Sequence, residues 1–343
     1  MEQLSPVYHA ATPVGPQRFS ANRRVAVIVP LYRASYLEHA LRSVLAQTRC
    51  PDEVIVVDDG SPDRAEIERA IAPFGNRITL IRQSNQGAAA ARNRGIAATT
   101  AEFIAMLDAD DEWFPQFLAE QLQLLTADPS LDLVYSDGVV TGQTRLAGQR
   151  FMVSCPSEGP VTLESLLAQR CTVLLSSVVA RRQAIIETGG FDLAIRRGQD
   201  FDLWLRMAYR GAHIAYQRKV LVVRRVHDDN LSGTAINEQE RPLRVLEKTL
   251  RTMTLSPHQR AIAEGRIRSL TASLARERGK LFLEQGDFAS ARREFELAAR
   301  GEFSWKIVGT LAGLRVAPHL VRRLFLWRTA AGASHLTPVR PTP

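Results

Sequence analysis

The stretch FIAMLDADDEWFP, Phe103–Pro115, joins a buried-strand pattern to a dense cluster of negative charge. Its first five residues are apolar, and Asp108, Asp110, Asp111 and Glu112 follow with no basic residue among them. Carboxylates this close raise one another's pKa or hold a cation. The alternation Asp108-x-Asp110 suits Mg²⁺ or Mn²⁺, which prefer oxygen ligands. The other interpretation is a solvated acidic turn in which Asp111 caps the next helix.

Strand-like and helix-like patterns alternate around this stretch. Strands are expected at Arg23–Tyr32, Val54–Val57, Arg77–Gln83 and Phe103–Leu107, and helices at Ser35–Thr48, Ala65–Phe74 and Gly87–Thr99. Short connections between them predict βαβ units in a mostly parallel sheet. Such sheets bind ligands at the carboxyl ends of their strands, which is where Pro30, Asp58–Asp59 and Asp108–Asp111 fall. The fold class is therefore α/β.

The second half of the chain changes character. Strands are expected at Asp132–Val140 and Thr172–Ala180, a helix at Gln199–Gly211, and only helices from about residue 236. Arg278–Arg300 has the small and aromatic spacing of one tetratricopeptide-like helix pair, which we expect to pack on its neighbours. The expected organisation is a flexible arm (1–21), an α/β domain (22–235), a basic all-helical domain (236–330) and a flexible tail (331–343).

Charge and composition narrow the function. The 343 residues carry a net charge of +8, but residues 241–343 hold 19 Lys and Arg against 8 Asp and Glu. Nucleic acid and an anionic membrane surface both suit such a basic region. The three scattered cysteines predict neither a disulfide framework nor a zinc site. No apolar run is long enough to span a membrane, so we expect a soluble, cytoplasmic protein.

The stretch Trp305–Arg328 is the most unusual part of the basic region. It mixes tryptophan, leucine and other apolar residues with Lys306 and several arginines, and Pro318 should break it into two segments. Apolar faces edged with basic residues suit helices that lie on anionic lipid at the cytoplasmic face of the inner membrane. The alternative is that these faces close the helical domain.

Six segments in order make the chain resemble the family 2 glycosyltransferases. They are VAVIVPLYRASYLEHALRSVLAQT, EVIVVDDGSPD, NQGAAAARNRGI, FIAMLDADDEWFP, ETGGFDLAIRRGQDFDLWLRMA and VRRVHDDNLS, within about residues 23–235. The resemblance implies the GT-A fold, a Rossmann-like sheet flanked by helices. It also implies inverting transfer of a sugar from a nucleotide donor, UDP-linked by expectation, with Mn²⁺ or Mg²⁺ as cofactor. The acceptor would be a carbohydrate or a lipid-linked sugar, and nucleic acid is not expected as a partner.

The resemblance assigns the donor side of the site. It implies that Pro30 and Tyr32 line the nucleotide pocket and that Asp59 meets the uracil base, with Asp58 supporting it. Without the resemblance, a turn formed by Asp59 and the Gly-Ser-Pro that follow it is the favoured interpretation.

The resemblance also assigns a second group of residues, near the metal and the diphosphate. The resemblance implies that Arg92 and Asn93 lie near the nucleotide or order the loop around it, although a structural salt bridge would also explain Arg92. Asp110 is implied as the direct metal ligand, and Asp108 as a ribose contact or further ligand. His227 is implied near the metal or diphosphate, with a structural role as the alternative.

The resemblance also assigns a general base, on the acceptor side of the site. By resemblance, Asp200 in the pair Gln199-Asp200 takes the proton of the acceptor hydroxyl. Asp202 is the competing carboxylate, and first-turn charge on a helix is its alternative role. The segment Gly189–Asp192 resembles an acceptor-side loop, and Trp204 is either a sugar-stacking or a core residue.

Two other functions are less well supported by the sequence. A sugar-1-phosphate nucleotidylyltransferase would carry a glycine-rich loop after its first strand, where this chain reads VPLYRASYL. A non-catalytic adaptor acting through its helices would be expected to lose acids, yet Asp59, Asp108, Asp110 and Asp200 are all present. We therefore expect a glycosyltransferase that acts in bacterial surface polysaccharide or glycoconjugate synthesis.

Overall fold

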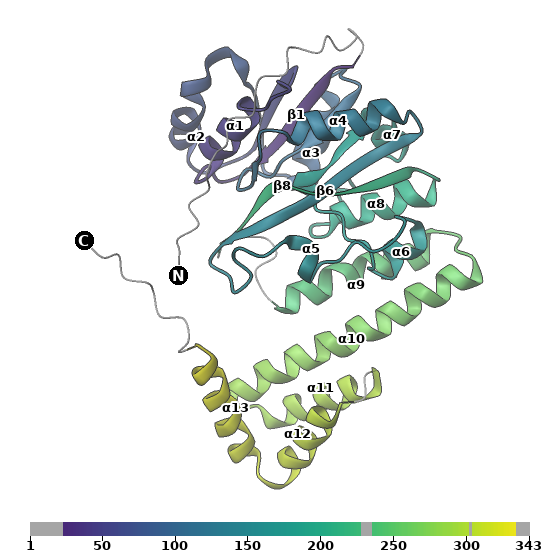
Figure 1. The fold of residues 1–343 in the computed structure, drawn as a ribbon. Coiled ribbons are helices and arrows are strands. Elements are labelled where there is room, and N and C mark those ends of the chain that lie inside the picture. The colour runs from purple at the N-terminus through teal and green to yellow at the C-terminus, as the bar shows by residue number, and fades with distance from the viewer. Residues whose placement is uncertain (1–22, 228–234, 302–303, 334–343) are drawn as a thin grey trace, which may run out of the picture.

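The computed structural model describes residues 23–227, 235–301 and 304–333 (Figure 1). The expected arm, residues 1–21, and all but the first three residues of the expected tail, 331–343, lie outside the described residues. One twisted sheet carries helices on both faces, and a run of helices extends from it.

The sheet has its strands in the order β3-β2-β1-β4-β7-β6-β8-β5. In chain order these are β1 (Val25–Leu31), β2 (Glu53–Asp59), β3 (Thr79–Gln83), β4 (Phe103–Met106), β5 (Glu112–Trp113), β6 (Leu131–Gly142), β7 (Val179–Arg181) and β8 (His213–Val226). The four strands from β3 to β4 run parallel, as expected. Beyond them the sheet is mixed, since β7 is antiparallel to both neighbours and β5 to β8, while β6 and β8 are parallel.

The helices connect these strands and then continue beyond the sheet. Within the part of the chain that forms the sheet they are α1 (Leu37–Leu45), α2 (Arg64–Ile71), α3 (Ala88–Ala97), α4 (Phe117–Ala127), α5 (Phe151–Ser154), α6 (Leu163–Leu167), α7 (Arg182–Glu187) and α8 (Gln199–Tyr209), with 3₁₀ turns η1 (Ala72–Arg77) and η2 (Leu175–Ser177). The C-terminal helices are α9 (Ala235–Thr252), α10 (Pro257–Gln285), α11 (Phe288–Gly301), α12 (Trp305–Val316) and α13 (Pro318–Ala333).

Strand β1 shows why the sheet is covered on both faces. Its residues are apolar on both sides: Val25, Val27 and Val29 pack in the cluster that contains α1 and α4, while Ala26 and Ile28 pack in the cluster that contains α3 and α8. A continuous apolar run is the expected pattern for a central parallel strand. Helix α3 approaches so closely that a Cβ on Gly95 would lie 2.5 Å from Ile28. The strand ends are thereby fixed relative to α3.

The expected strand at Thr172–Ala180 is largely wrong. Only Val179–Arg181 forms strand β7, and the preceding residues form turn η2. The hydroxyl of Ser177 donates to the Leu174 carbonyl at 2.7 Å, and that of Ser176 donates to Asp111 at 2.6 Å. Serine side chains that bond locally compete with strand pairing, which explains the turn.

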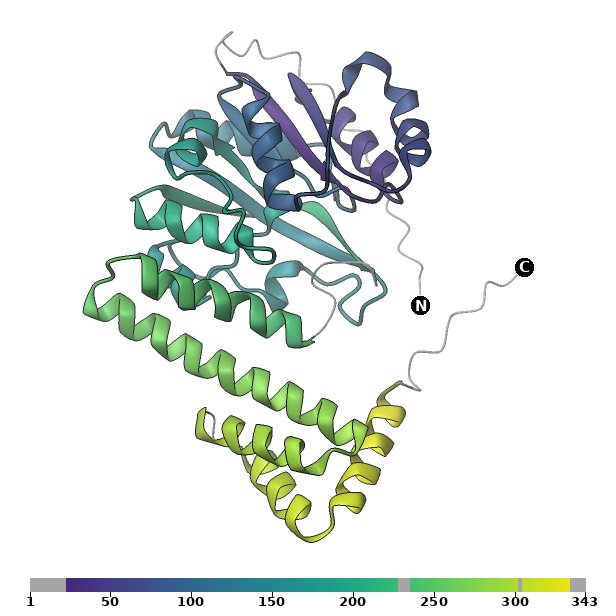
Figure 2. The same ribbon diagram turned by 180° about the vertical axis from the view of Figure 1, so that it is seen from behind.

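Beyond the sheet, the described residues from α9 onward are helical, except for short connections between the helices. Helix α10 ends at Gly286, whose φ of +82° is a left-handed conformation that favours glycine. Helix α11 then folds back, and the ring of Phe295 lies 3.1 Å from where a Cβ on Gly279 would be. In both views α10 lies between α9 and the α11–α13 group (Figures 1 and 2). No helix within the described residues is both long and apolar enough to cross a membrane.

Candidate active site

Three carboxylates gather directly after β4. Asp108, Asp110 and Asp111 each offer an oxygen within 4.8 Å of the others. Burial raises the pKa of Asp110, and the charge of Asp108 raises it further. Burial, followed by the charges of Asp110 and Asp108, raises the pKa of Asp111 well above its usual range. The cluster therefore holds negative charge that its surroundings do not fully offset.

Asp111 is not the solvated helix cap that the sequence also allowed. Its side chain is buried, and its two oxygens accept from the Ser176 hydroxyl at 2.6 Å and the Arg225 amide at 2.8 Å. The residue before α4 is Gln116, which makes no side-chain cap. The solvated-turn interpretation of Asp111 is wrong because η2 and β8 fold over this residue.

Asp108 contacts an arginine, and Asp110 contacts a histidine. Arg92 donates to Asp108 at 2.6 Å, and its guanidinium lies 5.4 Å from the centre of the Phe191 ring. His227 Nε2 lies 3.0 Å from Asp110, and its ring lies 5.2 Å from that of Tyr36. The structure thus places Arg92 and His227 beside the carboxylates with which the sequence grouped them.

The donor set of this cluster fits a divalent cation. Carboxylate oxygens are the ligands that Mg²⁺ and Mn²⁺ prefer, and a histidine nitrogen beside Asp110 is also acceptable to Mn²⁺. A bound cation would offset both the burial of these carboxylates and their mutual repulsion, which together raise the pKa of Asp110 and Asp111. Asp108, Asp110 and Asp111 are the residues that would hold it, with His227 next to them.

The ends of strands β1 and β2 carry the residues expected to bind the donor. Pro30, Tyr32 and Asp59 line the same cleft as the carboxylate cluster. Asp59 is buried and accepts from the backbone amides of Gln86 and Gly87 at 2.8 and 2.7 Å. Asp59 therefore shapes the loop that leads into α3, in addition to facing the cleft.

Asp58 and Asn93 lie elsewhere. Asp58 is buried, does not line the cleft, and accepts from the Ser61 amide at 2.8 Å, so it holds the turn that follows β2. Asn93 donates to the Phe191 carbonyl at 2.7 Å and accepts from the Phe191 amide at 2.9 Å. The loop that Asn93 orders is consequently the expected acceptor-side loop.

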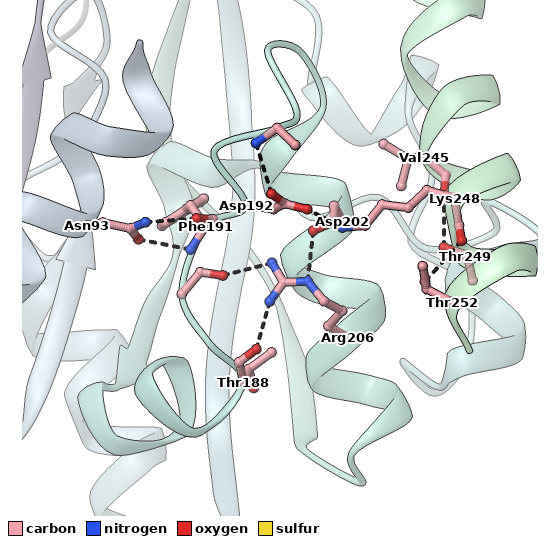
Figure 3. Close-up of polar contacts among 12 residues, drawn as sticks. Asn93, Thr188, Phe191, Asp192, Asp202, Arg206, Val245, Lys248, Thr249 and Thr252 are labelled. Atoms are coloured by element: carbon pink, nitrogen blue, oxygen red, sulfur yellow. Dashed lines mark hydrogen bonds and ion pairs between the residues drawn. The ribbon is translucent and has the colours of Figure 1, made fainter. Parts of the chain in front are cut away.

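Asp200 and Asp202 occupy contrasting environments on the first turn of α8. Asp200 is partly exposed and lines the cleft, and its side chain makes no hydrogen bond or ion pair with the part of the chain that the structure describes. Asp202 is 1% exposed and pairs with Arg206 at 2.8 Å and Lys248 at 2.5 Å (Figure 3). Asp202 is a structural ion-pair partner in this arrangement, and Asp200 is the carboxylate that can reach a ligand.

Lys248 was not expected from the sequence. It lies on α9, 46 residues after Asp202, and bridges Asp202 and Asp192, the latter at 2.7 Å (Figure 3). Hydrogen bonding from Lys248 holds the pKa of Asp192 below its usual value. Arg206 donates to the carbonyls of Thr188 and Gly190 at 2.8 and 2.7 Å. The loop Gly189–Asp192 is thus fixed to α8 and α9 by these charged side chains.

Trp204 is a core residue. Its side chain is 1% exposed and packs in the cluster under α8, which disfavours sugar stacking.

Further residues that the sequence did not reveal are Ser176 and Arg225, both bonded to the carboxylate cluster. Ser176 lies in η2, where a strand was predicted, and Arg225 lies in β8, which was not predicted. No local pattern therefore indicated these two residues.

Many of these residues border one cleft of about 1270 Å³, whereas Asn93, Asp192 and Lys248 line a separate pocket. The carboxylate cluster, the donor-side residues Tyr32 and Asp59, and the free carboxylate of Asp200 line it, and Glu238 and Arg241 of α9 complete its wall. Carboxylates that fit a divalent cation, an open cleft and an unpaired carboxylate facing it are components that metal-assisted group transfer requires.

Comparison with known proteins points in the same direction. Residues 26–174 match the model of glycosyl transferase family 2. A Rickettsia typhi protein named as an uncharacterized glycosyltransferase is 28% identical over 229 residues, which are 63% of this chain and 68% of that protein. Other relatives are longer, and the match spans 36% of those from Rickettsia conorii and Rickettsia felis.

Solved structures share the fold. Residues 1–349 of S. aureus TarS in complex with UDP align with a TM-score of 0.57 at 18% identity, covering 90% of this chain and 92% of that one. The mannosyltransferase PcManGT from Pyrobaculum calidifontis, in complex with GDP-Man and Mn²⁺, aligns with a TM-score of 0.58 at 21% identity, covering 91% and 87%. The expected GT-A architecture with an added helical region is confirmed.

Proposed function

Because the chain carries a family 2 glycosyltransferase domain, we propose that it is a metal-dependent inverting enzyme that moves a sugar from a nucleoside diphosphate to an acceptor hydroxyl. The observation that carries this proposal is the cleft that joins the carboxylate cluster to the unpaired Asp200. The donor we propose is a UDP-sugar, bound along Pro30, Tyr32 and Asp59.

In the proposed reaction Asp200 accepts the proton of the acceptor hydroxyl as its oxygen bonds to the anomeric carbon. The bond from that carbon to the diphosphate breaks, and the nucleoside diphosphate leaves with the electron pair. Attack from the opposite face inverts the anomeric configuration. A bound Mn²⁺ or Mg²⁺ would offset the charge that grows on the leaving phosphate.

Charged neighbours would keep these groups in place. Arg92 holds Asp108 through its 2.6 Å bond, and the buried partners of Asp111 fix the base of the cluster. We propose that Asp108 and Asp110 face the metal or ribose, with His227 next to Asp110. The ion pairs of Asp202 keep the first turn of α8, and with it Asp200, beside the cleft.

The pathway we propose is bacterial surface polysaccharide or glycoconjugate synthesis, with a carbohydrate or lipid-linked acceptor. Nucleotide sugars are made in the cytoplasm, so we propose that the enzyme works there, at the cytoplasmic face of the inner membrane when the acceptor is lipid-linked. Nucleic acid is not part of this proposal.

The test is a panel of UDP- and GDP-sugars incubated with the enzyme and Mn²⁺, followed for release of the nucleoside diphosphate. Release from one donor, abolished by a chelator and restored by Mn²⁺, is the expected result. Release from no donor would contradict catalysis and favour an adaptor role. Proton NMR of a transferred product reports whether the anomeric configuration is inverted.

A further inference from the structure

Helix α13 is fixed to the rest of the molecule by one of its faces. Val321 and Phe325, one turn apart, pack against the apolar cluster of the C-terminal helices. Arg322 donates to the Glu284 carbonyl, at the end of α10, at 3.1 and 3.0 Å. The helix therefore needs no further apolar contacts to hold its place.

A second face of α13 is also apolar, but it is exposed. Leu320, Leu324 and Trp327 are 56%, 53% and 68% exposed, and their spacing of four and three residues places them in one row. Arg323 and Arg328 are also exposed and lie in the same turns. We call these five residues the α13 face. An exposed row of large apolar side chains on a folded helix is typical of a binding surface.

The charge of this region selects the kind of partner. Residues 304–328 contain Lys306 and four arginines and no acidic residue. A second copy of the chain would bring like charges together, whereas an anionic surface would be attracted. Leucine and tryptophan between arginines suit a helix that lies at the boundary of lipid headgroups and acyl chains, where arginine stems also bury and their charged ends reach the headgroups.

The position of α13 relative to the cleft fits this partner. In both views α13 lies at the end of the molecule where α9 begins (Figures 1 and 2). Glu238 and Arg241, in the first turns of α9, line the cleft. Helix α13 therefore lies on the same side of the molecule as this wall of the cleft.

We propose that the α13 face docks the enzyme on an anionic membrane, with Leu320, Leu324 and Trp327 inserted at the interface and Arg323 and Arg328 on lipid phosphates. This deepens the proposed function by naming the surface that would deliver a lipid-linked acceptor. Docking itself requires neither donor nor catalysis.

The experiment is co-sedimentation of the full chain with phosphatidylglycerol–phosphatidylcholine vesicles, and with phosphatidylcholine vesicles alone. Binding to the anionic vesicles that weakens with added salt is expected. The variant Arg323→Gln/Arg328→Gln should bind about 25-fold more weakly, at about fivefold per arginine. The control Arg210→Gln/Arg251→Gln removes two exposed arginines elsewhere and should bind like the wild type.

The apolar contribution is tested by Leu320→Ser/Leu324→Ser/Trp327→Ser, which should lose detectable binding. The control Val153→Ser/Ile186→Ser changes exposed apolar residues at other places, 70% and 42% exposed, and should bind normally. All of these side chains are exposed, and an unchanged melting temperature verifies folding. Equal binding by the triple variant and its control, or no binding of the full chain to anionic vesicles at low salt, would overturn the proposal.

Tryptophan fluorescence gives an independent readout. Trp113 and Trp204 are buried, at 4% and 1% exposure, whereas Trp305 and Trp327 are 77% and 68% exposed. Anionic vesicles should shift the emission to shorter wavelength, and Trp327→Phe should reduce the shift. An unreduced shift would contradict insertion of Trp327. An enzyme that binds the vesicles but releases no nucleotide would contradict the proposed function alone. An enzyme that releases nucleotide but does not bind the vesicles would contradict docking alone.

Discussion

Two groups of aspartates in this molecule, each with one buried member, differ in how their charge is balanced. Around Asp192 and Asp202, Lys248 and Arg206 supply two positive charges for two negative ones. Around Asp108, Asp110 and Asp111, the ion pair to Arg92 and the contact with His227 leave an excess of negative charge, and the pKa of Asp110 and Asp111 is raised.

The difference separates architecture from binding. A buried acid whose partner comes from another helix fixes the relative position of the two elements, as Lys248 does for α8 and α9. Acids that raise one another's pKa destabilise the folded chain until a cation binds. The comparison predicts that substitutions in the first group affect stability and that those in the second affect ligand binding and activity.

The largest expected effect is on activity at the unbalanced group. Asp110→Asn should lower sugar transfer on the order of 10³-fold, because a lost metal contact removes several kcal/mol of stabilisation of the leaving phosphate. Calorimetric titration with Mn²⁺ should show weakened binding. Wild-type activity that persists in the presence of a chelator would contradict the metal role.

Asp200→Asn tests the unpaired carboxylate of α8. Turnover should fall on the order of 10²- to 10⁴-fold with donor affinity unchanged, because the acceptor proton has no base to accept it. Donor binding is measured by calorimetry and turnover by nucleotide release. The matched variant Asp202→Asn should instead lower the melting temperature; if it proves the more damaging to turnover at unchanged stability, Asp202 is the base.

Lys248→Met should destabilise the balanced group. It keeps most of the side-chain stem but leaves Asp192 and Asp202 short of one positive charge, which typically costs about 3–5 kcal/mol in the free energy of unfolding. The control Arg244→Met, on the same helix, removes a largely exposed ion pair with Glu240 and should cost at most about 1 kcal/mol. Urea unfolding measures both, and equal losses would contradict the role of Lys248.

The smallest expected effect again concerns Asp110→Asn, but it is a gain in stability and not a loss of activity. Without metal, Asp110→Asn should raise the melting temperature at neutral pH by about 2–4 °C per kcal/mol of repulsion removed. The raised pKa of Asp110 means that its charge destabilises the fold above that pKa and that protonation relieves the penalty as pH falls. The advantage of the variant should therefore shrink toward the unfolded-state pKa of about 3.9 and disappear with saturating Mn²⁺. A pH-independent difference would contradict this origin.

Much of the fold could be predicted because its signals are local. Apolar runs with helical segments between them marked β1 to β4 and their helices, and strand-end position brought Asp59 and the Asp108–Asp111 segment to one edge of the sheet. Strand β8 escaped prediction because Arg218, Lys219, Arg224 and Arg225 interrupt its apolar pattern. These side chains are tolerated there because Arg218 and Lys219 are exposed and Arg224 and Arg225 are only partly buried.

The sequence by itself determined the parallel half of the sheet, the helical C-terminal region and which residue types gather at the strand ends, since each depends on spacings of a few residues. Only the tertiary structure decided which acids are balanced. Asp111 is buried by Ser176 and Arg225, 65 and 114 residues away, and Asp202 is paired by Lys248, 46 residues away. Such partners are chosen by how helices and strands pack, because the cost of burying a charge depends on what the fold places beside it.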